Sequence, residues 1–350
     1  MQNSRENIND YFQYTVITKI EYVNENPMAL PAFTLCLVSS KADSNNLTLD
    51  KSLYNCSISG TVCDTKDFYS FELFVSYNNA LITCYVLNGG RNSTGHSSDI
   101  IATKNTGPFT GFSLAFFLRK DHFFYYYIND AYIKPTTSDN IKFLLPGTSN
   151  VIILEKTVET KLEYPFNNCW NLGNMPDTPL VRQLSAGNIT YRQVNCFELC
   201  FQNFVQNYAW EQGISEDDAR GKDEVKNYDE EKDCNHLCPL ECESTQYKIF
   251  ESKSQLAATT DIEKYSKELI PKIEKKLNIT INSKDEFNQN YLELFVFFDS
   301  LQYTKISQTP KTTLSALISN LGGSTGLFLD LSFISVCRAI EFFLGIIFKI

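Results

Sequence analysis

The distribution of cysteine constrains this chain more than any other feature. Ten of its eleven cysteines lie between Cys36 and Cys242, and the eleventh, Cys337, lies alone in an apolar C-terminal stretch. An even set of this kind indicates disulfides that form outside the reducing cytosol. The alternative is a zinc site built from Cys234, His236, Cys238 and Cys242. Disulfides are the better interpretation, and we expect no metal site.

The spacing of the cysteines predicts part of their pairing. Cys196 and Cys200 are four residues apart, as are Cys234 and Cys238, and residues four apart share one face of a helix. Two antiparallel helices joined by the intervening loop would place Cys200 beside Cys234 and Cys196 beside Cys238. The sequence therefore predicts a ladder of two disulfides.

The sequence constrains the disulfide pairing of the other six cysteines less strongly. Cys242 needs an upstream partner, and Cys169, just before Trp170, is the nearest unused candidate. Spacing leaves the pairing open among the remaining four, which are Cys36, Cys56, Cys63 and Cys84.

Charge and motif content argue against two broad classes of function. The chain has 41 acidic and 31 basic side chains, a formal charge of -10, so a nucleic acid is not an expected partner. It has three histidines, none in a metalloprotease spacing, and lacks nucleophile-elbow, Walker and dinucleotide-binding motifs. We therefore expect neither an enzyme nor a cofactor.

The residue pattern predicts a mixed α+β fold. Aromatic and β-branched runs predict strands within residues 11–37, 68–87, 109–132, 151–162 and 290–306. Helices are predicted over residues 194–210, 217–237 and 261–277. The last of these contains Pro271, which should kink or divide it.

Residues 327–347 form an apolar window of 21 residues, long enough to cross a bilayer, interrupted by Asp330, Arg338 and Glu341. Each ionisable group at a membrane centre costs ~2.5 to 3.5 kcal/mol, so this predicted transmembrane helix should face protein or water, as a pore-lining helix does. The alternative is a marginal anchor in which Arg338 and Glu341, three residues apart, neutralise each other.

The N-terminal residues, MQNSRENINDYFQY, do not have the basic and then apolar segments of a signal peptide. A single C-terminal span would leave the cysteines in the cytosol. We therefore expect an export signal or a first membrane helix upstream of this sequence.

Several short motifs occur in a fixed order over about residues 8–349. They are LPAFTLC at 30–36, PG at 146–147, YPFNNC at 164–169, the Cys196 and Cys200 pair, CPLEC before Tyr247, and GGSTGLFLDLS at 322–332. In this order they resemble the family of degenerins, epithelial sodium channels and acid-sensing ion channels. The last motif is similar to the family's Gly-Gly-x-x-Gly-Leu-Phe-x-Gly-x-Ser entry to the pore.

The resemblance implies a trimeric cation channel whose subunits have two membrane helices and a disulfide-rich extracellular domain with palm, β-ball, finger, thumb and knuckle. It divides this chain into a stub at 1–10, palm and β-ball at 11–165, thumb at 166–246, knuckle helix and palm strands at 247–310, and wrist with pore helix at 311–350. It also implies the disulfides Cys36 with Cys84, Cys56 with Cys63, Cys169 with Cys242, Cys196 with Cys238, and Cys200 with Cys234.

The resemblance further assigns residues to the pore and its gating. They are Asp330, Leu331 and Ser332 in the selectivity filter, Gly322, Gly323 and Gly326 in helix packing, Ser319 at the gate, Arg338 and Glu341 in the inner pore, and Tyr14 with Phe166 as a gating contact. Asp330 stands where the family has a glycine, and Arg338 replaces an acidic residue. The stretch between Cys36 and Cys56 is far shorter than the family's finger.

We therefore expect a subunit of a ligand- or stimulus-gated cation (sodium) channel of the amiloride-sensitive type. It would lie in the plasma membrane, with residues of about 11–310 extracellular. Its partners would be the lipid bilayer, related subunits in a homo- or heterotrimer, and cations, with calcium joining sodium if Asp330 forms a ring. The alternative is a non-conducting, membrane-anchored binding or regulatory protein derived from such a channel. The stimulus is left open among protons, peptide and tension.

Overall fold

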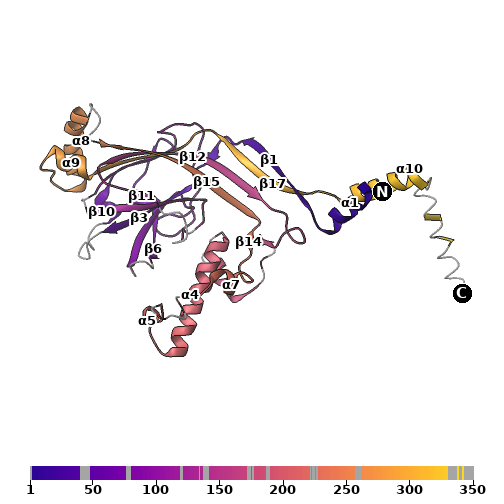
Figure 1. Ribbon diagram of the computed structural model, residues 1–350. Helices are drawn as coiled ribbons and strands as arrows, with labels where there is room; N and C mark the ends of the chain where they lie inside the picture. Colours follow the sequence, from indigo (N-terminus) through magenta and orange to yellow (C-terminus); the bar gives the residue numbers. More distant parts are fainter. Residues whose placement is uncertain are drawn as a thin grey trace. The chain divides into compact units, whose positions relative to one another are not determined.

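The computed structural model (Figure 1) describes residues 2–39, 48–75, 80–118, 121–133, 135–136, 142–171, 175, 177–186, 190–220, 222, 225, 228–256, 262–329, 337–338 and 341–342. The chain divides into two compact units. Unit 1 comprises Met1–Ile20, Thr160–Cys169 and Ile306–Ile350, and unit 2 comprises Glu21–Glu159 and Trp170–Lys305.

The larger sheet has eight strands, with β1, β17, β12, β16, β9, β4 and β5 in order and β15 paired to β12. Its strands are β1 (Val16–Asn24), β4 (Leu53–Ile58), β5 (Thr61–Val62), β9 (Phe112–Phe117), β12 (Thr148–Thr160), β15 (Glu243–Gln255), β16 (Tyr291–Phe298) and β17 (Gln302–Pro310). β12 and β16 are parallel, whereas β9 pairs antiparallel with both β16 and β4.

A second sheet has five strands in the order β11, β10, β3, β7 and β6. They are β3 (Ala32–Ser39), β6 (Phe68–Val75), β7 (Ala80–Leu87), β10 (His122–Asn129) and β11 (Lys142–Leu144). Two small sheets pair β2 (Met28–Ala29) with β8 (Ala102–Thr103), and β13 (Cys169–Trp170) with β14 (Leu240–Glu241).

The main core lies between these sheets because alternate side chains of their strands are apolar. On β16, Leu292, Leu294 and Val296 are fully buried in this core. Phe33 of β3 packs against the rings of Phe112 and Tyr126, with centroids 5.8 and 5.7 Å away. The aromatic runs that predicted strands are therefore the residues that fill the core.

The helices that the structure describes are interspersed with the strands along the chain. They are α1 (Gln2–Phe12), α2 (Leu49–Ser52), the 3-10 helix η1 (Thr65–Asp67), α3 (Pro179–Ala186), α4 (Gln193–Gln212), α5 (Glu216–Arg220), α7 (Glu230–Cys234), α8 (Ile262–Leu277), α9 (Lys284–Asn290) and α10 (Leu314–Leu329). α8 and α9 lie together at one end of the large sheet (Figure 1). The fold is thus mixed α+β, as predicted.

One of the helix predictions differs from the structure. The acidic helix predicted over residues 217–237 is wrong, because α5 and α7 are separate and residues 228–229 between them are not helical. Asp229 accepts a hydrogen bond from the backbone N–H of Lys232 and so starts a new helix. The helix predicted over residues 261–277 is present as α8, and Pro271 does not divide it. The alternative that Pro271 kinks it stays a prediction.

The strand predictions also need correction at two places. Residues 290–306 do not form one strand, because the chain turns at residues 299–301 between β16 and β17. Asp299 and Ser300 are residue types that favour such a turn. At the N-terminus, the predicted strand region begins as helix, since α1 continues to Phe12.

Among the described residues, no helix is long and apolar enough to cross a membrane. The structure describes α10 as far as Leu329. Most of the predicted span at residues 327–347 lies outside the described residues. The C-terminal membrane helix and the five-part division of the chain therefore stay predictions.

Candidate functional site

In unit 1, a tight turn joins α1 to β1. Gln13 donates its backbone N–H to the carbonyl of Asn9, and Thr15 donates to the carbonyl of Asp10. Between them Tyr14 adopts a φ of 53°, a left-handed conformation that is uncommon outside glycine. This turn fixes the direction in which the Tyr14 ring leaves the chain.

The start of α10 is attached to the same turn. Lys311 donates its backbone N–H to the carbonyl of Thr15 at 2.8 Å, and its ammonium lies 2.9 Å from the carboxylate of Asp10. Thr313 then caps α10 by accepting a hydrogen bond from the N–H of Ala316. α1 and α10 also pack against each other. The two helices are therefore held together where they meet β1 and β17.

A third segment of unit 1, residues 160–169, is tied to β17. The amide of Asn167 donates to the carbonyl of Leu162 at 2.8 Å and to the side-chain oxygen of Gln308 at 2.7 Å. The same oxygen of Gln308 accepts from the backbone N–H of Leu162. This loop therefore has a fixed geometry relative to β17.

Phe166 extends from this loop to Tyr14. The two ring centroids are 5.6 Å apart with an interplanar angle of 81°, an edge-to-face arrangement. The contact predicted from the sequence is present, while its role in gating stays a prediction. Nothing in the sequence indicated the Asp10 to Lys311 or Asn167 to Gln308 contacts, because each joins polar residues far apart in the chain.

The predicted pore residues are described only in part. Ser319, Gly322 and Gly323 are exposed on α10, and a Cβ atom built at either glycine would meet no heavy atom within 4 Å. Gly326 also lies in α10. Because these positions are three, four and seven residues apart, they form one strip of small residues along the helix.

The rest of the predicted pore lies further along the chain. Asp330, Leu331 and Ser332 lie outside the described residues. Arg338 and Glu341 are described as helical and exposed. The filter and inner-pore assignments therefore stay predictions.

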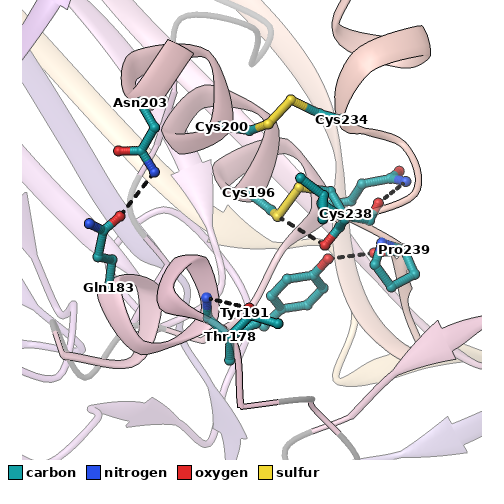
Figure 2. Close-up of a disulfide and its surroundings, with 12 residues drawn as sticks. Thr178, Gln183, Tyr191, Cys196, Cys200, Asn203, Cys234, Cys238 and Pro239 are labelled. Atoms are coloured by element: carbon teal, nitrogen blue, oxygen red, sulfur yellow. Dashed lines mark hydrogen bonds between the residues drawn. A yellow bond between two sulfur atoms is a disulfide. The ribbon is translucent and has the colours of Figure 1, made fainter. Parts of the chain in front are cut away.

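The disulfide ladder lies in unit 2 (Figure 2). Cys196 bonds Cys238 and Cys200 bonds Cys234, with Cα atoms 5.7 and 6.3 Å apart. Both distances lie in the normal range for disulfides. The register predicted from the spacing is correct, although α7 ends at Cys234 and Cys238 lies in the turn after it. These thiols are consumed in disulfides and are not available to a zinc ion.

Hydrogen bonds attach the end of the ladder to the segment before α4. The hydroxyl of Tyr191 donates to the carbonyl of Pro239 at 2.5 Å (Figure 2). The amide of Gln193 donates to the carbonyl of Cys238 at 2.8 Å. Burial, together with the charge of Glu241, raises the pKa of Tyr191 well above its usual value. Tyr191 therefore stays a neutral donor at every physiological pH.

Two further disulfides are paired as the resemblance implies. Cys36 of β3 bonds Cys84 of β7, where the two residues face each other across the strand pair. Cys56 bonds Cys63, which closes the short loop after β4. The remaining two, Cys169 and Cys242, are each disulfide-bonded as well. Cys337 is a free, exposed cysteine.

The structure reveals one charged network that the sequence did not indicate. The carboxylate of Glu251 accepts hydrogen bonds from the hydroxyl of Tyr126 and the ammonium of Lys142, and it pairs with Lys253 at 3.2 Å. Burial alone would raise the pKa of Glu251, but these three donors outweigh it and lower that pKa. The network connects β10, β11 and β15 of unit 2.

Comparison with known proteins identifies relatives of this chain. A family model described as amiloride-sensitive sodium channel matches residues 37–342. The epithelial sodium channel subunit gamma of Neoceratodus forsteri is 23% identical over 324 residues, which cover 84% of this chain and 46% of that protein. The subunit beta of Aquarana catesbeiana is 21% identical over 271 residues, which cover 70% of this chain and 95% of that protein.

The chain spans about half the length of the gamma subunits that it matches. Among solved structures, a cryo-EM structure of a proton-activated chloride channel aligns with 97% of this chain and 89% of its own, with 6% identity and a TM-score of 0.32. That likeness is too low to support an argument.

Proposed function

Because this chain belongs to the amiloride-sensitive sodium channel family, we propose that it is a subunit of a plasma-membrane cation channel that passes sodium when assembled as a trimer. The match to the family over residues 37–342 is the observation that carries this proposal. Relatives named as epithelial sodium channel subunits support it. Conduction through a channel requires a lined pathway rather than a catalytic site.

The proposed ion pathway follows α10 and the residues after it. In a trimer, three copies of the strip formed by Ser319, Gly322, Gly323 and Gly326 would allow close approach of the helices. The exposed positions of the first three on α10 support this use. Ser319 would then form the gate.

The filter would lie beyond Leu329, at Asp330, Leu331 and Ser332. Three Asp330 carboxylates around a threefold axis would attract cations strongly and would favour calcium over sodium. Three copies of Arg338 further along would oppose cation exit. We therefore propose weak or calcium-blocked conduction rather than free sodium selectivity.

Unit 1 supplies a route for gating. Tyr14 follows α1, Phe166 lies on the loop tied to β17, and Lys311 ties α10 to the turn that holds Tyr14. A movement of residues 160–169 would therefore be transmitted to both helices through one aromatic contact and one ion pair. The stimulus that causes this movement is left open among protons, peptide and tension.

The test is to record currents from the complete subunit, alone and with related subunits, with and without amiloride. Sodium currents that amiloride blocks support the proposal. Asp330→Gly should restore sodium selectivity or abolish calcium block if the ring exists. Unchanged currents in this variant would reject the ring.

A non-conducting regulatory subunit is the second candidate. The charged residues Asp330 and Arg338 at pore positions favour it, because a subunit that contributes only its extracellular domain to a mixed trimer would tolerate them. Such a subunit would give no current alone but would alter the currents of its partners. A channel that contains this subunit would then not need three copies of it.

A further inference from the structure

Sequons of the form Asn-X-Ser or Asn-X-Thr occur at five places in the chain, which are Asn46, Asn55, Asn92, Asn188 and Asn278. A sequon is the acceptor sequence for attachment of a glycan to the asparagine side chain. It is short enough to arise by chance, so its occurrence alone does not identify a modified residue. The structure describes the sequons at Asn55, Asn92 and Asn278, and their surroundings differ.

The sequon at Asn278 lies where α8 ends. Asn278 follows Leu277, the last residue of the helix, and adopts a φ of 52°. Ile279 donates its backbone N–H to the carbonyl of Glu274 at 3.3 Å. This is the hydrogen bond of a Schellman cap, in which the first residue after the helix is left-handed and is usually glycine, sometimes asparagine. The helix therefore ends at a fixed position, and the sequon forms the turn after it.

Within this sequon the middle residue faces the protein and the two outer residues face water. Ile279 packs against the cluster that contains Ile273 and Phe287. Asn278 and Thr280 are exposed. Among the described residues, neither of these two side chains makes a hydrogen bond. The amide of Asn278 and the hydroxyl of Thr280 are therefore both accessible from solvent.

The other two described sequons are more closely engaged in the fold. The side-chain oxygen of Asn92 accepts hydrogen bonds from the backbone N–H and the hydroxyl of Thr94, so the hydroxyl of this sequon is already used. Asn55 lies within β4, and Cys56 after it is buried and disulfide-bonded. Of the three, Asn278 is the one that combines a position outside the strands with a free amide and a free hydroxyl.

We propose that Asn278 carries an N-linked oligosaccharide. The donor is a lipid-linked oligosaccharyl diphosphate. The side-chain nitrogen of Asn278 bonds to the anomeric carbon of the first sugar while the bond from that carbon to the diphosphate oxygen breaks. The lipid diphosphate leaves with the electron pair of that bond, and the amide nitrogen gives up one proton, so no oxidant or reductant is needed. The product is a bulky polar group, which an exposed turn can accommodate.

This inference rests on the extracellular placement of unit 2 in the proposed function, and not on ion conduction. The disulfides of unit 2 support that placement, because they form outside the reducing cytosol. A glycan at Asn278 would also keep the end of α8 out of any close contact between subunits, because the sugars would occupy the space that a partner would need.

The test is to express the complete subunit in animal cells and to treat its peptides with peptide N-glycosidase in water labelled with heavy oxygen. Mass spectrometry then marks each asparagine that carried a glycan, and we expect Asn278 to be marked in most molecules. Thr280→Val keeps the shape of the side chain and removes its hydroxyl. It should abolish the mark at Asn278 and reduce the mass of the subunit by one glycan, whereas Thr280→Ser should keep both.

The matched control is Asn282→Gln. Asn282 is an exposed asparagine in the same loop and has neither Ser nor Thr two residues later, so this variant should leave the glycan unchanged. An unmarked Asn278 in protein whose Cys200 and Cys234 are disulfide-bonded would overturn the inference while the extracellular placement stands. An unmarked Asn278 together with free thiols would overturn both. A mark that survives Thr280→Val would also overturn the inference.

Discussion

The β-sheet core and the α4 region, which comprises α3, α4, α5 and α7, are stabilised by different means. The sheet core buries large side chains almost completely, among them Phe33, Phe116 and Phe124. In α4, by contrast, only four of twenty residues are buried, and Trp210 near its end is 88% exposed. Two disulfides hold this helix to the segment around α7.

The difference follows from the surface available to each region. A sheet covered on one face by a second sheet removes a large apolar area from water, and this burial stabilises the region, although the disulfides of Cys36 with Cys84 and of Cys56 with Cys63 also lie in it. A single long helix beside short helical segments cannot bury enough apolar surface to be stable by burial alone. Disulfides therefore supply much of the stability of this region. We expect the sheet core to respond to cavities and the α4 region to respond to reductant.

The largest effect is expected from a cavity in the sheet core. Phe116→Ala should lower the free energy of unfolding by about 3–5 kcal/mol, because a fully buried ring is lost and its space is only partly refilled. Chemical denaturation followed by circular dichroism measures this. A loss below about 1 kcal/mol would contradict the view that burial stabilises this region.

Removal of one rung of the ladder should come next. Replacing both Cys200 and Cys234 by serine opens a loop with a sequence separation of 34 and should cost about 3–4 kcal/mol. Limited proteolysis should then cleave within residues 193–234, while the sheet core stays protected. Equal loss of protection in both regions would show that they unfold together and that the comparison fails.

Loss of the Glu251 network should have a smaller, pH-dependent effect. The folded pKa of Glu251 is lowered, so its contribution is complete above the usual carboxyl pKa of about 4.3 and is lost as pH falls through the folded pKa. Glu251→Gln should therefore cost about 1.5–3 kcal/mol at pH 7 and less at pH 3. Denaturation midpoints of both proteins from pH 3 to 7 measure this. A pH-independent difference would contradict the charged network.

The smallest effect is expected at the Tyr14 and Phe166 pair, which lies in unit 1 and outside both regions. Phe166→Ala should change the balance between open and closed channels by about 0.5–1.5 kcal/mol, because an edge-to-face contact is lost. Phe166→Leu is the control that keeps an apolar side chain. If Phe166→Ala unfolds the protein instead of altering gating in current recordings, the pair is simple packing.

The comparison also explains which features the sequence could predict. Cys196, Cys200, Cys234 and Cys238 repeat at the helical period, so the ladder follows from local spacing. Strand positions follow from aromatic and β-branched runs. Periodicity describes one element at a time, so it missed the turn at residues 299–301 and the break before α7.

Contacts between distant residues could not be predicted in the same way. Asn167 meets Gln308 and Glu251 meets Tyr126 only because the strands bring them together. Polar residues of these types are common on any surface, and nothing in their local sequence marks their partners.

The pairing of β1 with β17 has a consequence for biosynthesis. β1 is at the edge of the large sheet, and its neighbour β17 is formed by residues near the end of the chain. Gln302 donates a hydrogen bond to Asn24 across a separation of 278 residues. At a synthesis rate of about 5–20 residues per second, β1 would wait for tens of seconds before its partner leaves the ribosome. During that time its backbone groups are an open edge to which other chains can add, so this strand is where we expect folding helpers to be needed.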